Sequence, residues 1–461
     1  MKKLSCFFIL FVFSVAVVAQ QPWYKYSPLD YSWQNVGNAG FSAGTAWYTS
    51  LAISPSGEPY VAYQDGGNAN KASVMKFDGT KWVYVGNEGF STGAIYTPIL
   101  VFSTSGQPYI AFQDSSYGNK AVVMKFDGNS WVNVGSPGFS PGDANSPSFA
   151  FSPSGQPYIS YADLNNNAFK GVVQKFDGTS WVTVGNTYFS PGAVSFTSLA
   201  FSPTNGEPYV AYKDYVNSYK ATVTKFDGTN WVNVGSAGFS LAEARWVSLA
   251  LNASGEPYVA YQDFGDSVKA TVMKFDGTNW MPVGNVGFSK GMANYTNMVI
   301  SQNGQPYVTF EDFGNSAKAS VMKFDGNNWV YVGNAGFSPG YVYWTSMALN
   351  TSGQIYLAFM DYANANRATV MTYDFPAGIS EKQHSKLCCY PTPATNNITF
   401  ETSGNATKSQ LSVLNLNGQE LITRLVTEPT TQIDISMLPA GVYVVRLTNE
   451  NTVQVGKIIK Q

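Results

Sequence analysis

Hydrophobic and aromatic residues along this chain come in short runs that are separated by turns rich in glycine, proline, serine and asparagine. One complete set of such runs predicts four strands, at residues 49–54, 59–65, 71–77 and 82–86. Asp78-Gly79 lies between the third and fourth runs, and this pair favours a tight hairpin because glycine accepts a positive φ. The set therefore predicts one four-stranded antiparallel sheet.

This set returns along the chain with a period of 49 or 50 residues. The tryptophan that begins the fourth strand marks each copy: Trp33, Trp82, Trp131, Trp181, Trp231, Trp280 and Trp329. A period of this length without a helical pattern is typical of a β-propeller, in which each repeat is one blade.

The two ends of the repeat region predict how the ring closes. No tryptophan strand follows the last copy, which ends near residue 375, whereas one extra tryptophan strand at residues 33–37 precedes the first complete copy. Each strand type then occurs seven times if the N-terminal strand completes the last blade, and this closure removes open edges that would otherwise invite aggregation. We predict an all-β fold with a seven-bladed propeller over residues 33–375.

The first twenty residues have the pattern of a secretory signal peptide. Lys2 and Lys3 precede an apolar run at residues 4–18, and small residues at 17–19 have the pattern of a cleavage site. Residues 21–32 form an N-terminal segment before the first predicted strand. No apolar run of membrane-spanning length follows, so we predict an exported protein without a transmembrane segment in the mature chain.

Composition and charge narrow the classes of partner. The chain has 44% hydrophobic residues, 12% charged residues and 43 glycines, which is typical of a turn-rich β protein. Its formal charge is −2, or −4 without Lys2 and Lys3 (25 basic against 29 acidic residues). Nucleic acid is therefore not expected as a partner, because phosphate backbones require a basic surface.

Residues 376–389 are polar and do not repeat, and we predict a linker there. It contains the one histidine, His384, and the adjacent Cys388 and Cys389. We expect the two thiols to have no role in the fold; a vicinal disulfide or a soft-metal site are the alternatives.

From residue 390 short strands alternate with Asn-Gly and Ala-Gly turns, which predicts a small β-sandwich over residues 390–461. The motifs are YPTP at 390–393, LNLNGQEL at 414–421, LPAGVY at 438–443 and a basic end at 457–460. They closely resemble the type A C-terminal sorting domain of the Bacteroidetes type IX secretion system, with Thr392 where asparagine is usual. The resemblance implies passage by Sec, then export by the type IX machinery as a partner, with the domain removed and the protein released or held at the cell surface.

An acidic and a basic residue recur in every repeat. The aspartate ends the second strand and the basic residue begins the third, so the two face each other across one hairpin. We expect a cross-strand ion pair or a bond that ties the loop, and a ring of metal or substrate ligands is the alternative. The pairs are Asp65 and Lys71, Asp114 and Lys120, Asp163 and Lys170, Asp214 and Lys220, Asp263 and Lys269, Asp312 and Lys318, and Asp361 and Arg367.

The sequence offers little for catalysis. The only histidine is in the linker, and no phosphate-binding glycine loop or zinc-ligand spacing occurs, so we expect no cofactor and no metal site. The Asp-Gly turns resemble the Asp-box of sialidases, but their spacing differs, and we interpret them as turns. A pair of carboxylates would suffice for a glycosidase. The acids that do not repeat are Asp143, Glu243, Asp266 and Glu311.

The loops that vary between repeats should all emerge on one face of the ring, which is where rigid scaffolds usually carry recognition. Aromatic residues precede the innermost strand in six repeats, with Ser146 as the exception: Tyr48, Tyr96, Phe196, Trp246, Tyr295 and Trp344. Trp47, Arg245 and Tyr343 lie beside them, and Tyr215, Phe264, Phe313 and Tyr362 follow the recurrent aspartates. The rings either bind a ligand or close the mouth of the channel by packing on one another.

We therefore predict a non-catalytic binding module for a glycan or a protein partner. One alternative is a carbohydrate-active enzyme, a glycosidase or lyase, that uses a pair of carboxylates on the same face. The other is a purely structural adhesin component, which would bind no small ligand.

Overall fold

The computed structural model describes residues 32–165, 168–373, 388–401, 409–415, 419–428, 430–448 and 453–461. The predicted signal peptide, residues 21–31 and most of the linker, including His384, lie outside the described residues. The chain divides into two compact units, one up to residue 375 and one from residue 376.

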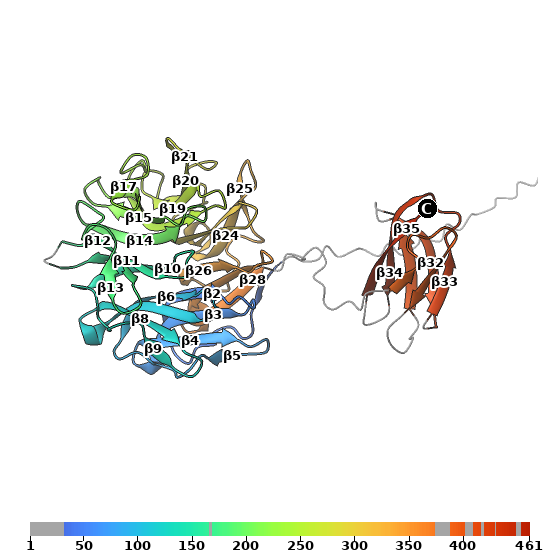
Figure 1. The fold of residues 1–461 in the computed structure, drawn as a ribbon, viewed down its shortest axis with the longest axis horizontal. Coiled ribbons are helices and arrows are strands. Elements are labelled where there is room, and N and C mark those ends of the chain that lie inside the picture. The colour runs from blue at the N-terminus through green and yellow to red at the C-terminus, as the bar shows by residue number, and fades with distance from the viewer. Residues whose placement is uncertain are drawn as a thin grey trace, which may run out of the picture. The chain divides into compact units, whose positions relative to one another are not determined.

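The first unit is a ring of seven four-stranded antiparallel sheets, which confirms the predicted all-β propeller (Figure 1). We number the blades 1 to 7 by their innermost strands: β2 (Ala46–Ile53), β6 (Ile95–Phe102), β10 (Ala144–Phe151), β14 (Val194–Phe201), β18 (Ala244–Leu251), β22 (Ala293–Ile300) and β26 (Val342–Leu349).

The second strands are β3 (Pro59–Asp65), β7 (Pro108–Asp114), β11 (Pro157–Asp163), β15 (Pro208–Asp214), β19 (Pro257–Asp263), β23 (Pro306–Asp312) and β27 (Ile355–Asp361). The third strands are β4 (Lys71–Phe77), β8 (Lys120–Phe126), β12 (Lys170–Phe176), β16 (Lys220–Phe226), β20 (Lys269–Phe275), β24 (Lys318–Phe324) and β28 (Arg367–Tyr373). The outer strands are β5 (Trp82–Tyr84), β9 (Trp131–Asn133), β13 (Trp181–Thr183), β17 (Trp231–Asn233), β21 (Trp280–Pro282), β25 (Trp329–Tyr331) and β1 (Trp33–Asn35).

The described helical segments are turns of three residues: η1 (Gly66–Asn68), η2 (Ser115–Tyr117), η3 (Phe313–Asn315) and η4 (Tyr362–Asn364). None of these segments is long and apolar enough to cross a membrane.

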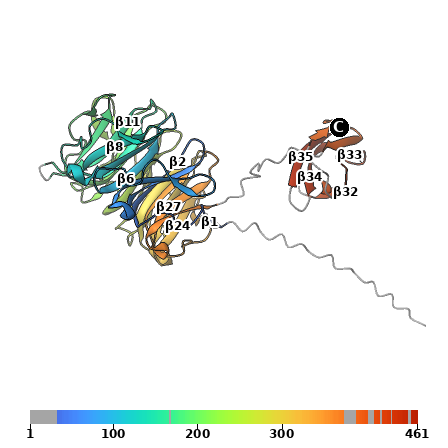
Figure 2. The ribbon, with the colours of Figure 1, turned by 90° about the horizontal axis from the view of Figure 1, so that it is seen from below.

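The N-terminal strand closes the ring as predicted. β1 is the fourth strand of blade 7, where Trp33 pairs with Tyr373 and Asn35 with Met371. Figure 2 shows the first strand beside the last blade, although about 340 residues separate them in the chain.

The recurrent tryptophans join neighbouring blades. Each indole N–H donates to the carbonyl of a valine in the preceding blade, over 2.7–2.9 Å, and Trp33 does so to Val332 across the closure. Trp33 also stacks on Phe337, with 3.9 Å between ring centroids and an interplanar angle of 6°. A buried indole with its N–H satisfied contributes both area and orientation. The recurrent tryptophans therefore pack neighbouring blades against one another.

The recurrent aspartates tie the loop rather than pairing with the basic residues. Asp65 is fully buried; its Oδ1 accepts from the Gly67 N–H at 2.9 Å, and its Oδ2 accepts from Asn68 Nδ2 at 2.9 Å and Ser73 Oγ at 2.7 Å. Asp65 and Lys71 are backbone neighbours in the ladder. Among the described residues, however, none of the seven aspartates makes an ion pair with the basic residue of its hairpin. Of the two expected roles, the structure shows the bond that ties the loop and not the ion pair, because the carboxylate caps a turn inside the blade.

This difference predicts unequal effects of two substitutions in one hairpin. We expect Asp65→Ala to lower the free energy of unfolding by about 1–3 kcal/mol, because the buried donors of Ser73 and the turn lose their acceptor. Lys71→Ala should change it by less than about 0.5 kcal/mol, because Lys71 makes no ion pair with Asp65. Urea unfolding of both variants measures this; equal losses would support an ion pair after all.

The second unit consists of two sheets with one shared core. The first sheet holds β29 (Cys388–Tyr390), β30 (Asn397–Glu401) and β33 (Thr430–Asp434). The second holds β32 (Glu420–Val426), β31 (Ser409–Leu414), β34 (Gly441–Thr448) and β35 (Val453–Lys460). Cys388 and Cys389 lie in β29, so the predicted linker ended two residues too late. Cys389 packs against the core and Thr392 accepts a hydrogen bond from the Ile459 N–H at 3.2 Å.

Candidate binding site at the mouth of the propeller

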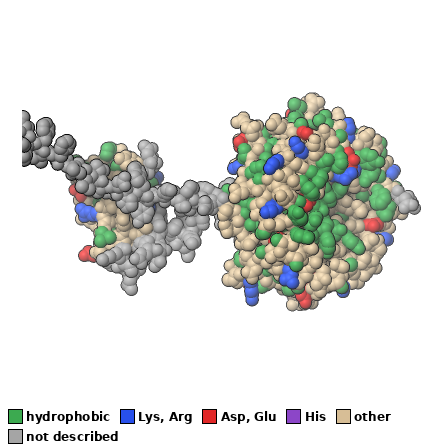
Figure 3. All heavy atoms as spheres, turned by 180° about the vertical axis from the view of Figure 1, so that it is seen from behind, with side chains coloured by type: hydrophobic (Ala, Val, Ile, Leu, Met, Phe, Trp, Pro, Cys, Tyr) green, Lys and Arg blue, Asp and Glu red, His purple; other side chains and the backbone are tan. Residues whose placement is uncertain are grey.

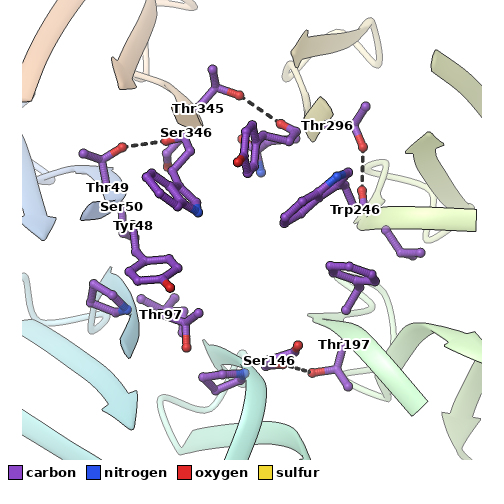
Figure 4. Close-up of a pocket in the computed structure, with 18 residues that line it drawn as sticks. Tyr48, Thr49, Ser50, Thr97, Ser146, Thr197, Trp246, Thr296, Thr345 and Ser346 are labelled. Carbon is purple, nitrogen blue, oxygen red and sulfur yellow. Dashed lines mark hydrogen bonds between the residues drawn. The ribbon is translucent and has the colours of Figure 1, made fainter. Parts of the chain in front are cut away.

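A β-bulge near the start of every innermost strand places one residue of each blade at the channel mouth. At this residue the backbone is left-handed, with φ between 46° and 54°, and the register with the second strand shifts. Such a φ is uncommon outside glycine, so the neighbouring contacts must hold it. The seven residues are Tyr48, Thr97, Ser146, Phe196, Trp246, Tyr295 and Trp344. They line a cavity of about 300 Å³, into which Figure 4 shows Tyr48 and Trp246 pointing.

Five of these side chains form a continuous aromatic arc over blades 4, 5, 6, 7 and 1. Ring centroids lie 4.8 Å apart for Phe196 and Trp246, 4.5 Å for Trp246 and Tyr295, 5.6 Å for Tyr295 and Trp344, and 4.8 Å for Trp344 and Tyr48. All five are half-buried. The contacts are tilted, with interplanar angles of 47–52°, so the rings present faces as well as edges to the cavity.

The side chains on the opposite side of the mouth are small, and two of them are polar. Blades 2 and 3 contribute Thr97 and Ser146, followed by Pro98 and Pro147. The mouth is therefore asymmetric. Large aromatic side chains lie on one side, and the small side chains on the other side leave space for a ligand. The sequence did not show this asymmetry, because Tyr96 stood in the position of Thr97 in the predicted alignment.

That alignment of Tyr96 was wrong by one residue. Tyr96 pairs with Gln113 as Trp47 pairs with Gln64, so Tyr96 belongs with Trp47, Arg245 and Tyr343 in the position before the bulge. These side chains stand on the rim; Trp47 and Tyr96 are 36% and 39% exposed. Trp47 still contacts the arc through the edge of Trp344, with centroids 5.2 Å apart.

Hydroxyl groups fix the bulges from the next blade along the ring. Thr49 Oγ1 donates to the Trp344 carbonyl at 2.6 Å, Thr296 Oγ1 donates to the Trp246 carbonyl at 2.5 Å, and Thr345 Oγ1 donates to the Tyr295 carbonyl at 2.9 Å (Figure 4). Thr197 binds the Ser146 carbonyl in the same way, at 2.7 Å. These bonds connect blades whose inner strands share no ladder, and they pre-organise the mouth. The sequence reasoning missed these threonines, although their recurrence directly after the bulge was a visible signal.

Exposed apolar side chains also lie beyond the mouth. Hydrophobic side chains gather in a continuous band over one face of the propeller (Figure 3). Most exposed large hydrophobic residues of the propeller lie in the loops between second and third strands, in the loops between blades, or at the start of the innermost strands: Trp47, Tyr96, Phe169, Tyr215, Val216, Tyr219, Leu241, Phe264, Phe313, Tyr341 and Tyr362. An apolar surface of this kind is typical of an interaction site.

Between blades 4 and 5 the rim carries its own cations. Lys213 and Arg245 each donate to Glu243 Oε1 at 2.6 Å. Burial opposes ionisation of Glu243, but the two cations outweigh it and lower the pKa of that carboxyl. Lys213 Nζ lies 5.3 Å from the ring centre of Tyr215, and Arg245 Cζ lies 4.4 Å from that of Phe264. Arg245 therefore pairs with Glu243 and lies over the Phe264 ring.

Glu311 is the one buried residue among the four acids that do not repeat. It is 2% exposed, and its Oε2 accepts from Asn294 Nδ2 at 2.9 Å. Burial raises the pKa of the Glu311 carboxyl to about 7. Asp143 accepts from Gln113 Nε2 at 2.5 Å, and burial raises its pKa as well. Asp266 follows β19 near Gly287.

The lining of the mouth contains hydroxyl, amide and aromatic groups and neither a carboxylate nor a histidine. Among the described residues no group of three His, Cys, Asp or Glu side chains is arranged to hold a metal ion. The chemistry available at the mouth is stacking on rings and hydrogen bonding to hydroxyl groups.

Comparison with known families identifies the C-terminal unit. Residues 388–461 match the family described as "Secretion system C-terminal sorting domain". This confirms the resemblance that the motifs indicated and extends it by two residues, to include Cys388 and Cys389. The protein is accordingly an exported protein, on the cell surface or secreted. No curated protein matches the chain in sequence.

Solved structures resemble the propeller. PorZ, a surface component of the type IX secretion system of Porphyromonas gingivalis, is 12% identical with a TM-score of 0.50; the match covers 91% of this chain and 60% of PorZ. A polysaccharide lyase of family PL25, an ulvan lyase, is 13% identical with a TM-score of 0.50, and the match covers 72% of this chain and 94% of the lyase. At these identities the likeness concerns the fold alone.

Proposed function

Because residues 388–461 match a secretion sorting domain, we propose that the type IX system delivers this protein to or beyond the cell surface. The predicted signal peptide and a Bacteroidetes source belong to this proposal, since both follow from the leader pattern and the type A motifs. PorZ, the structural relative, is itself named as a component of that system.

The propeller then acts as a non-catalytic binding module that takes a glycan, or side chains of a protein partner, at its mouth. One observation carries this: five half-buried aromatic rings in mutual contact face small side chains, two of them polar, across a cavity of about 300 Å³. Sugar rings offer an apolar face for stacking and hydroxyl groups at their edges. The tilted aromatic rings suit stacking on the apolar face of a sugar, and the hydroxyl groups of the mouth suit hydrogen bonds to the hydroxyl groups at its edge.

Two tryptophans of the arc test this function. We expect Trp246→Ala and Trp344→Ala each to weaken binding at least tenfold, for the oligosaccharide that binds best on a glycan array, because each removes one stacking face. Ser146→Ala, on the opposite side of the same mouth, should change the affinity less than threefold. Titration calorimetry measures the affinities, and thermal unfolding checks that the variants remain folded. Unchanged binding by both tryptophan variants would rule out this mouth as the site.

A carbohydrate-active enzyme is the second candidate, and Glu311 is the observation that favours it. A carboxyl with a pKa near 7 is suited to general acid catalysis. A glycosidase also needs a second carboxylate about 5–10 Å away, and the cavity beside Glu311 is lined by no other acid. Release of reducing or unsaturated ends from a polysaccharide by the wild type, abolished in Glu311→Gln, would identify this activity.

A further inference from the structure

A second cavity, of about 480 Å³, lies between blades 6 and 7 beside the mouth. β22, β23 and β26 contribute its walls, and Tyr295 lies between it and the mouth. The residues that matter are Glu311, Asn294, Tyr295, Phe313, Tyr341 and Tyr343. Phe313 and Tyr341 are 44% and 47% exposed, which is unusual for large rings that no partner covers.

Glu311 stands in this cavity with neutral neighbours only. Its one described hydrogen bond comes from Asn294, whose Oδ1 in turn accepts from Gln262 Nε2 at 2.6 Å. No described lysine or arginine lies within ion-pair distance of Glu311, and none lines the cavity. A buried carboxyl without a cation is unfavourable in its charged form, so it is normally paired or bound to a ligand.

In the equivalent groove between blades 4 and 5, side chains of the protein itself occupy the site, and we call it the filled groove. Its residues lie 98 positions, two repeats of 49, before four residues that line the second cavity and one beside it. Lys213 corresponds to Glu311, Tyr215 to Phe313, Glu243 to Tyr341 and Arg245 to Tyr343, and Phe264 corresponds to Tyr362, which contacts Tyr341. There a carboxylate, two cations and the aromatic rings satisfy one another, with Lys213 Nζ 5.0 Å from the Tyr219 ring centre.

The groove between blades 6 and 7 also contains one carboxylate and several rings, but its carboxylate stands at the position of a lysine, and no described cation lines it. Both basic positions of the filled groove are changed, to Glu311 and Tyr343, and the position of Glu243 carries another ring, Tyr341. Tyr341 also contacts Tyr362, with centroids 5.6 Å apart. The cavity therefore has the carboxylate and the aromatic rings of a cation-binding site, and no described cation of the chain lines it.

We propose that this cavity binds an organic ammonium group supplied from outside the chain, with Glu311 as the counter-ion and Phe313, Tyr341 and Tyr343 as the aromatic walls. Aromatic rings around a carboxylate are the chemistry that recognises quaternary and alkylated ammonium ions. A divalent metal ion fits less well, because it requires several oxygen ligands and the cavity offers one carboxylate. This binding function is separate from the proposed recognition at the mouth.

Titration calorimetry of the full chain with choline chloride at pH 8 tests the site. We expect saturable binding, and at least tenfold weaker binding of the neutral isostere 3,3-dimethylbutan-1-ol. Glu311→Gln should weaken choline binding at least tenfold. Tyr343→Arg should also weaken choline binding at least tenfold. Its guanidinium would pair with Glu311, as that of Arg245 pairs with Glu243 in the filled groove. Glu256→Gln, an exposed acid at another turn, makes the same change in charge and should bind within twofold of the wild type.

The source of the ammonium group is decided by a second titration, with Nα-acetyl-lysine amide. Tighter binding of choline indicates a free quaternary amine, and tighter binding of the lysine derivative indicates a protein side chain; either result supports the site. The proposal is overturned if neither compound binds saturably, if the neutral isostere binds as well as choline, or if Glu311→Gln binds choline like the wild type.

Discussion

Trp33→Ala is expected to lower the free energy of unfolding of the propeller by about 3–5 kcal/mol, the range for truncating a buried tryptophan. Trp33 is 7% exposed, stacks on Phe337 and donates its indole N–H to the Val332 carbonyl at 2.9 Å. Its strand is held to blade 7 by a short ladder of three residue pairs. Losing the side chain therefore loosens the joint that makes the chain a ring and exposes two sheet edges.

The measurement is urea unfolding of the wild type and two variants. Trp47→Ala serves as the control, because Trp47 is also a tryptophan of the first unit but is 36% exposed on the rim; it should lose less than about 1 kcal/mol. We also expect Trp33→Ala to aggregate more readily near its unfolding midpoint, since the edge of β28 is then unpaired. If the two variants lose equal stability, β1 does not hold the ring closed.

The second large effect is a dependence of stability on pH caused by Glu311. The ordinary pKa of a glutamate is 4.5, and burial raises that of Glu311 in the folded protein to about 7. Between these values the unfolded chain has released the proton while the folded protein still holds it, so stability falls as pH rises. Above about pH 7 both states are ionised and the penalty stays constant. The full difference corresponds to about 3 kcal/mol.

Glu311→Gln removes this titration. Relative to the wild type, the variant should gain about 3 kcal/mol of unfolding free energy between pH 4.5 and pH 8, measured by urea unfolding at both values. The Tyr295 phenol, which lines the same cavity, remains neutral over that range, because burial and the neighbouring Glu311 raise the pKa of Tyr295 to about 12. A matched exposed variant, Glu256→Gln, should show no such gain. A difference between Glu311→Gln and wild type that is the same at both pH values would contradict a buried, unpaired Glu311.

Repetition made most of the architecture predictable. The second strand, at residues 59–65, and the third, at 71–77, begin and end where the sequence placed them, because turn residues bound both. The innermost strand begins at Ala46, three residues earlier than predicted. A bulge at Tyr48 interrupts its pattern there, and a left-handed residue that is not glycine has no sequence signature of its own.

The candidate site was only partly visible in the sequence. The aromatic column was recognised, yet Tyr96 was placed in it because an aromatic residue stood one position from the expected one. For a related reason, the sequence left open whether the recurrent aspartates form an ion pair or a bond that ties the loop. Sequence spacing brings Asp65 and Lys71 opposite each other in the ladder, but it does not say into which environment each side chain turns.

The amino-acid sequence alone was enough to establish the blade, the count of seven, the closing strand and the sorting domain. Each of these depends on residues close together in the chain or on a period that repeats many times. The asymmetric mouth and the threonine bonds depend instead on contacts between neighbouring blades, fifty residues or more apart in the chain. The isolation of Glu311 depends on which side chains of blades 6 and 7 line its cavity. Such contacts are set by the bulges and by which side chains meet once the ring has closed, and no local pattern records them.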